Sequence, residues 1–155
     1  MSRIFATSCL AFALAASFAA PARAELAAWD QAKVTALAGQ LAEASSSLYS
    51  TFYKQGPPQL GSGQASDYRE LKQQVRRIQS EAKELAGALG KGDGREDTLD
   101  IYENLMEIVR DARENARRVF STKDVQDQAS KVRQLLNQIS PYYDPDAAPL
   151  QPAIR

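Results

Sequence analysis

The sequence predicts an all-α protein, an antiparallel up-down-up-down four-helix bundle with an extended Pro-rich C-terminal tail. Apolar residues recur at spacings of three and four in four separate segments, as they do on one face of a helix. No segment of useful length alternates polar and apolar residues as a half-buried strand would. Two of the three connectors are short, and short connectors place neighbouring helices antiparallel.

The longest connector separates the first two helices. We expect the first helix over residues 26 to 53, and Gly56-Pro57-Pro58 ends it because proline cannot donate the backbone hydrogen bond that a helix needs. The second helix is expected to begin near Asp67, where Glu70 follows in the pattern of a capping box, and to end at Leu89.

The last two helices follow short connectors. Glycines within residues 90 to 94 separate the second helix from the third, which is expected to end near Phe120. Thr122 can cap a fourth helix, and Pro141 closes that helix by disfavouring the α conformation at the residue before it. The residues expected to face inward include Val34, Leu41, Ala44, Leu71, Val75, Ala82, Leu85, Leu105, Ala112, Val125, Ala129, Leu136 and Ile139.

Residues 1–24 have the features of an export signal. Arg3 precedes an Ala-rich apolar run, and the run ends in Ala22-Arg23-Ala24, a small-x-small pattern typical of signal-peptidase sites. We therefore expect cleavage after Ala24 and a periplasmic or secreted protein of the bacterial envelope. No stop-transfer pattern follows, so no transmembrane anchor is expected after processing.

The mature chain is expected to form one domain and a tail. Residues 25–140 supply the bundle, in which the fourth helix is shorter than the first, so one end lacks a fourth wall. Residues 141–155 contain several prolines and should be extended. We expect this tail to pack on the short end of the bundle through Tyr142, Tyr143 and Leu150.

The mature chain lacks the side chains of common metal, haem and redox sites. The sequence has no histidine, and its single cysteine, Cys9, lies in the signal. Helix number and length resemble those of periplasmic b-type and c-prime cytochromes, but their haem-ligating histidine is missing. We predict no metal, no haem and no other cofactor. Because the commonest general base is also absent, we predict a protein that is not an enzyme.

All nine aromatic residues of the mature chain fall near the expected ends of the helices. Those beside the long connector form a possible aromatic mouth for a ligand, made of Tyr49, Phe52, Tyr53, Tyr68 and Phe120. The competing interpretation is that these rings only plug the ends of the bundle, because large rings with polar tips suit such positions. The favoured interpretation is the plug.

Basic residues cluster near the same end of the bundle. A possible patch for an anionic ligand or partner comprises Arg69, Lys72, Arg76, Arg77, Arg110, Arg113, Arg117 and Arg118. Bases at the end of the third helix complement its macrodipole and need no function. Bases in the first half of the second helix oppose the dipole of that helix, so their grouping is less easily explained. The favoured interpretation is still a solvated face with intrahelical ion pairs.

Two functional hypotheses follow. The first is an exported, non-enzymatic bundle acting through its surface as an accessory or scaffold protein, with another envelope protein or an anionic surface as partner. The alternative is a carrier or sensor of an apolar or anionic amphiphilic ligand bound at the aromatic and basic end. Removing the two arginines of the signal from 19 Lys and Arg leaves 17 against 19 Asp and Glu, a formal charge of −2, so no nucleic acid partner is expected. Homodimerisation is also compatible with the apolar residues Ile101, Met106 and Ile108.

Overall fold

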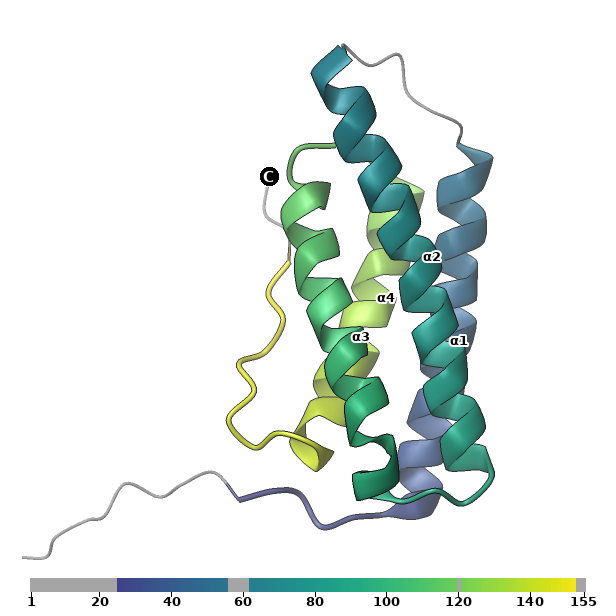
Figure 1. The fold of residues 1–155 in the computed structure, drawn as a ribbon, viewed down its shortest axis with the longest axis vertical. Helices are drawn as coiled ribbons and strands as arrows, with labels where there is room; N and C mark the ends of the chain where they lie inside the picture. The colour runs from purple at the N-terminus through teal and green to yellow at the C-terminus, as the bar shows by residue number, and fades with distance from the viewer. Residues whose placement is uncertain (1–24, 56–61, 120, 153–155) are drawn as a thin grey trace, which may run out of the picture.

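The computed structural model describes residues 25–55, 62–119 and 121–152, and within these ranges the chain is all-helical (Figure 1). Its elements are α1 (Gln31–Lys54), α2 (Ser62–Gly90), α3 (Arg95–Ala116), α4 (Lys123–Ile139) and a 3₁₀ turn, η1 (Ser140–Tyr142). The four-helix bundle predicted from the sequence is confirmed. The signal at 1–24 and the aromatic residue Phe120 lie outside the described residues.

Three helix boundaries differ from the expected ones. α1 begins at Gln31 because the Asp30 side chain accepts a hydrogen bond from the Lys33 backbone at 3.0 Å, as an N-cap does. α2 begins at Ser62, before Asp67, since no proline follows Pro58 in the connector. α3 ends at Ala116 rather than near residue 120.

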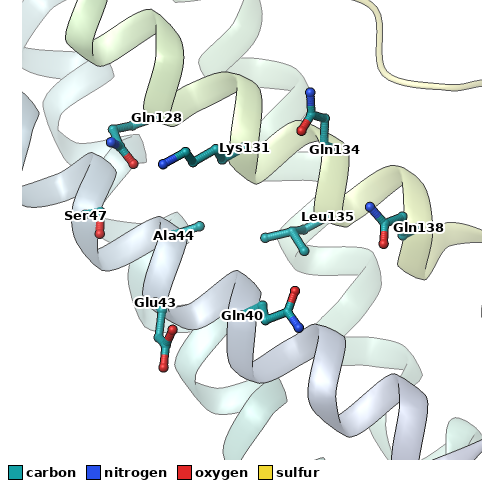
Figure 2. A pocket seen from close by; sticks show the side chains of 9 residues that line it. All are labelled: Gln40, Glu43, Ala44, Ser47, Gln128, Lys131, Gln134, Leu135 and Gln138. Carbon is teal, nitrogen blue, oxygen red and sulfur yellow. The ribbon is translucent and has the colours of Figure 1, made fainter.

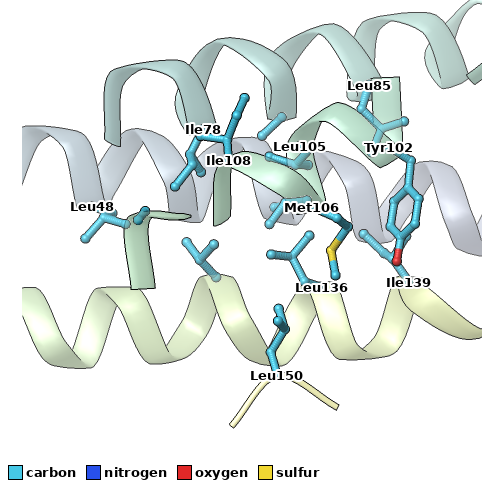
Figure 3. Close-up of a cluster of buried hydrophobic side chains, with 14 of the residues drawn as sticks. Leu48, Ile78, Leu85, Tyr102, Leu105, Met106, Ile108, Leu136, Ile139 and Leu150 are labelled. Carbon is cyan, nitrogen blue, oxygen red and sulfur yellow. The ribbon is translucent and has the colours of Figure 1, made fainter. Parts of the chain in front are cut away.

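The helices enclose one apolar core (Figure 3). Leu41, Leu85, Leu105 and Leu136, one from each helix, are fully buried. At about 25 cal/mol per Å² of apolar surface, burying each leucine stabilises the fold by roughly 1.5–3 kcal/mol before entropy costs. Met106 and Ile108 also lie in this core, so these two residues are not available for a dimer interface.

The helices do not pack equally around the bundle. α1 packs against both α2 and α4, and α2 packs against α3. Between α3 and α4 there is no interface of similar extent along the described chain. The bundle is therefore open along the seam between its third and fourth helices.

One end of the bundle, here called the tail end, contains η1 and the chain before α1. Trp29 meets Tyr143 edge to face at 5.6 Å between centroids, and Tyr143 stacks on Tyr102 at 4.3 Å. The Tyr102 hydroxyl donates to Ser140 Oγ at 2.9 Å, and the Tyr143 hydroxyl lies 2.8 Å from Thr98 Oγ1. The buried rings of Tyr102 and Tyr143 therefore join α3 to the residues that follow α4.

After η1 the tail turns back and runs beside α3 and α4 (Figure 1, yellow). The backbone of Leu150 is held by Asn137 of α4, whose Oδ1 accepts from Leu150 N at 2.9 Å and whose Nδ2 donates to Leu150 O at 3.4 Å. The Leu150 side chain is buried and points into the core cluster (Figure 3). Leu150 thus lies along the open seam rather than at the tail end.

Candidate functional site

The open seam between α3 and α4 leads into an apolar cleft with a volume of about 630 Å³, within the usual range for small-molecule sites. All four helices contribute to its walls, and Leu150, Gln151 and Pro152 of the tail border it. The helical residues lining it are Leu48, Phe52, Leu71, Val75, Ile78, Val109, Ala112, Arg113, Ala116, Val125, Gln126, Ala129, Ser130, Val132 and Arg133, with Arg117, Val119 and Ser121 from the α3–α4 connector.

The cleft lies in the half of the bundle that contains the end of α1, the start of α2, the end of α3 and the start of α4, here called the loop end. Its floor consists of large apolar side chains, with Phe52 from α1 and Val75 and Ile78 from α2. Water at such a surface finds few hydrogen-bond partners. Displacing that water with an apolar group is favourable, so the floor suits a hydrocarbon ligand.

Small residues explain why this seam stays open. Ala112 and Ala116 of α3 and Ala129 of α4 line the cleft. Tyr143 lies between the two helices at the tail end, and Leu150 lies between them beside the cleft. At the cleft itself, an alanine side chain is too short to bridge the space between α3 and α4. Ala129 was expected to face a packed interior, but it is exposed in the cleft. The alanines of α3 and α4 therefore line an opening between the two helices instead of allowing them to pack closely.

Among the described lining residues, three are charged, and all three are arginines: Arg113, Arg117 and Arg133. Arg117 Nη1 pairs with Glu114 at 3.0 Å, and Arg133 Nη2 donates to Ser130 Oγ at 2.9 Å. Arg113 Nε is buried and has no hydrogen-bond partner in the described chain. The cleft wall therefore combines apolar surface with positive charge.

The predicted aromatic mouth divides into two pairs. Phe52 stacks on Tyr68 at 5.2 Å, and both rings are buried, but only Phe52 lines the cleft. Tyr49 and Tyr53 form a second pair at 4.1 Å on the surface of α1. Burial raises the pKa of Tyr68. Burial is also the main cause that raises the pKa of Tyr53, and the neighbouring Tyr49 raises it further. Both phenols are therefore neutral at physiological pH.

The predicted basic patch also divides. Arg113 and Arg117 line the cleft, whereas Arg110 and Arg118 are exposed and do not. On α2, Lys72 Nζ lies 4.3 Å from the centre of the Tyr53 ring.

The other basic residues of α2 are exposed. Arg69 Nε donates to Ala65 O at 3.2 Å, and Arg76 and Arg77 are at the surface. A Gln74–Asn115 hydrogen bond of 3.1 Å joins α2 to α3 close to the basic residues of both helices. The basic stretches of α2 and α3 therefore both lie near the Gln74–Asn115 contact, but only residues of the α3 stretch line the cleft.

A second, polar groove of about 370 Å³ lies between α1 and α4 (Figure 2). Four glutamines, Gln40, Gln128, Gln134 and Gln138, line it together with Glu43, Ala44, Ser47, Lys131 and Leu135. The groove is polar and shallow, and its side chains are those of an ordinary solvated helix surface. It offers no apolar contact area comparable to that of the cleft.

The three serines of the run 45 to 47 lie in different surroundings. Ser45 is buried with its hydroxyl unpartnered, Ser46 Oγ accepts from Gln79 Nε2 at 3.3 Å, and Ser47 lines the polar groove. The described side chains that border the cleft include no Asp, Glu, His, Cys, Lys or Tyr, and its lining there is apolar apart from serine, glutamine and arginine.

Most residues of the cleft, Arg133 and Leu150 among them, were not singled out as site residues from the sequence. Arg133 lies among the polar residues of α4 and outside the basic stretches of α2 and α3, and Leu150 lies in a proline-rich tail. No sequence pattern links these two residues to Arg113, because only the folded structure brings α4 and the tail close to α3. Neither could be assigned to the site without the structure.

Comparison with protein-family models, with curated proteins and with solved structures finds no match to this chain. Within the described ranges, no group of three or more His, Cys, Asp or Glu residues is placed to hold a metal ion. No helix in those ranges has the length and apolar character that crossing a membrane would require.

Proposed function

We propose that this chain is an exported, non-enzymatic carrier or sensor that holds an apolar or amphiphilic ligand in the cleft between α3 and α4. The observation that carries this proposal is the cleft of about 630 Å³, with an apolar floor built by all four helices. Export rests on the signal pattern of residues 1–24.

The distribution of apolar surface supports a ligand-binding function. Leu26, at 37% exposure, is the only large hydrophobic residue classed as exposed in the described chain. The part of the outer surface formed by the described residues therefore has no broad patch of large exposed hydrophobic residues of the kind that marks a stable protein interface. The apolar area that this protein offers to a partner molecule is concentrated inside the cleft.

The hypothesis of an accessory or scaffold protein has its own candidate surface. Tyr49, Tyr53 and Lys72 form a cation–aromatic cluster on the α1–α2 face, and Arg76 is close enough to influence the pKa of Tyr53. This face would suit an acidic segment of an envelope protein or an anionic surface. It is a second candidate function, supported by this cluster alone.

The ligand-binding function is tested with N-phenyl-1-naphthylamine, a neutral apolar probe whose fluorescence rises in apolar sites. We expect saturable, one-site binding by the mature chain. The Ala129→Trp variant should abolish the signal, because the indole ring would occupy the cleft. Ala44→Trp is the matched control, since Ala44 lies in the polar groove on the other side of α4 (Figure 2).

Circular dichroism of both variants should show the wild-type helix content. The proposal fails if the wild-type chain does not bind the probe, or if folded Ala129→Trp binds it as well as wild type does.

A further inference from the structure

We infer that the ligand of the cleft is a single-chain amphiphile with one anionic head group, a carboxylate or a phosphate monoester, held by Arg113. This inference rests on the proposed function and adds the chemistry of the head group and the placement of the chain. In this arrangement the head lies at the Arg113 side of the cleft, and the hydrocarbon chain lies on the apolar floor and reaches towards Leu150.

The first argument is the unpartnered nitrogen of Arg113. Its Nε is buried in the cleft wall, and a buried donor without an acceptor costs free energy. The N–H groups of a guanidinium lie in one plane, so the two oxygens of a carboxylate or phosphate that reaches the accessible part of this group can accept two hydrogen bonds together. An alcohol oxygen or a neutral ester cannot satisfy the charge of this group.

A comparison within the chain shows that Arg113 is unusual. Arg95 at the tail end also has a buried Nε without a partner. However, Arg95 Nη2 donates to Ala27 O at 2.9 Å, and its guanidinium lies 5.3 Å from the Trp29 ring. Arg113 has no hydrogen bond or ion pair to another described residue. Within the described residues, the hydrogen-bonding capacity of Arg113 is therefore not used.

The second argument is the sign of the surrounding charge. Arg113 belongs to α3 and Arg133 to α4, so both helices beside the opening contribute a cation. No Asp or Glu is among the described lining residues. Like charges beside a low-dielectric apolar surface raise the local positive potential and attract anions. A cationic or zwitterionic amphiphile would be disfavoured at the same position.

The third argument is the shape of the cleft. Its lining on α4 extends from Val125 to Arg133, which is roughly 12 Å of helix at 1.5 Å per residue. Leu150 limits the cleft on the tail side, because Asn137 holds its backbone through two hydrogen bonds. The volume is at the middle of the range for small ligands, which favours one chain of medium length over two.

The test is isothermal titration calorimetry of the mature chain with decanoate, decyl phosphate, decanol and decyltrimethylammonium, each below its aggregation concentration. Both anions should bind about 10- to 100-fold more tightly than decanol, as expected for a charged hydrogen-bonded partner. The cationic amphiphile should bind more weakly than decanol. The tighter of the two anions identifies the head group.

Arg113→Gln should remove the preference for anions, so that decanoate and decyl phosphate bind no more tightly than decanol, and circular dichroism checks that the variant is folded. Arg110→Gln is the control, because Arg110 is on the same helix but exposed and outside the cleft. With a series of carboxylates of increasing length, affinity should rise about fourfold per methylene and level off when the chain fills the cleft.

The outcomes separate the two proposals. Equal binding of decanol and decanoate, or an anion preference that survives Arg113→Gln, overturns the head-group inference and leaves the ligand-binding function standing. If no amphiphile binds and the neutral probe also fails, the proposed function is wrong and this inference falls with it.

Discussion

The two ends of the bundle differ in what fills the space between α3 and α4. At the tail end, α3 and α4 are separated, but Tyr102 and Tyr143 fill the space and their hydroxyls are hydrogen-bonded to Ser140 and Thr98. At the loop end the same two helices are separated, and alanines leave the space open. The comparison indicates that packed rings close the tail end, whereas the loop end keeps the cleft that we propose as the ligand site.

The largest expected effect comes from breaking the tail end. Tyr102 is 3% exposed, so Tyr102→Ala removes a buried ring and should lower the free energy of unfolding by about 3–5 kcal/mol. Tyr102→Phe keeps the stack on Tyr143 and loses only the hydrogen bond to Ser140, at a cost of about 1 kcal/mol. Urea unfolding followed by circular dichroism measures both. Similar losses in the two variants would contradict a structural role for the ring stack.

Leucine substitutions at two alanines, one in the core and one in the cleft, should change the free energy of unfolding less, and in opposite directions. Ala82 is fully buried, so Ala82→Leu should overpack the core and cost about 1–3 kcal/mol. Ala129 faces the cleft, so Ala129→Leu should fill empty space and stabilise the fold by about 0.5–2 kcal/mol. Thermal unfolding of the two variants measures the difference. Destabilisation of comparable size at both positions would mean that the cleft is not open in solution.

These two alanines also show how far the sequence could predict the structure. The spacing of apolar residues predicts four helices and their buried faces, because helix periodicity and core burial are linked directly. It cannot distinguish Ala82 from Ala129, since both occupy seam positions and alanine is compatible with close contact or with an open cleft. That distinction depends on how far apart α3 and α4 lie, which the rings at the tail end and Leu150 determine together.

The candidate site was predictable only in part for a similar reason. Arg113 and Arg117 belong to a basic stretch that the sequence shows clearly. Arg133 and Leu150 reach the same cleft from α4 and from the tail, and only the fold brings them together. The expected aromatic mouth contributes Phe52 alone, because Tyr68 stacks behind it and the other two described rings lie on the α1 surface.

The smallest expected effect is a loss of stability at high pH that arises more from the tail end than from the loop end. Burial is the main cause that raises the pKa of Tyr102, Tyr143 and Tyr68 above 10.0. Below the pKa of the unfolded chain these phenols are neutral in both states, and their full contribution to stability is present.

As pH rises above about 10, the unfolded chain releases these protons first, so the free energy of unfolding should fall. Urea unfolding between pH 8 and 11 measures this slope, and tyrosinate absorbance reports the ionisation itself. Tyr143→Phe should flatten the slope more than Tyr68→Phe, because Tyr143 lies between Tyr102, on which it stacks, and Trp29, which meets it edge to face at the closed end of the bundle. An equal or larger change for Tyr68→Phe would show that the loop end is as tightly packed as the tail end, and the proposed division between a closed end and a binding end would not hold.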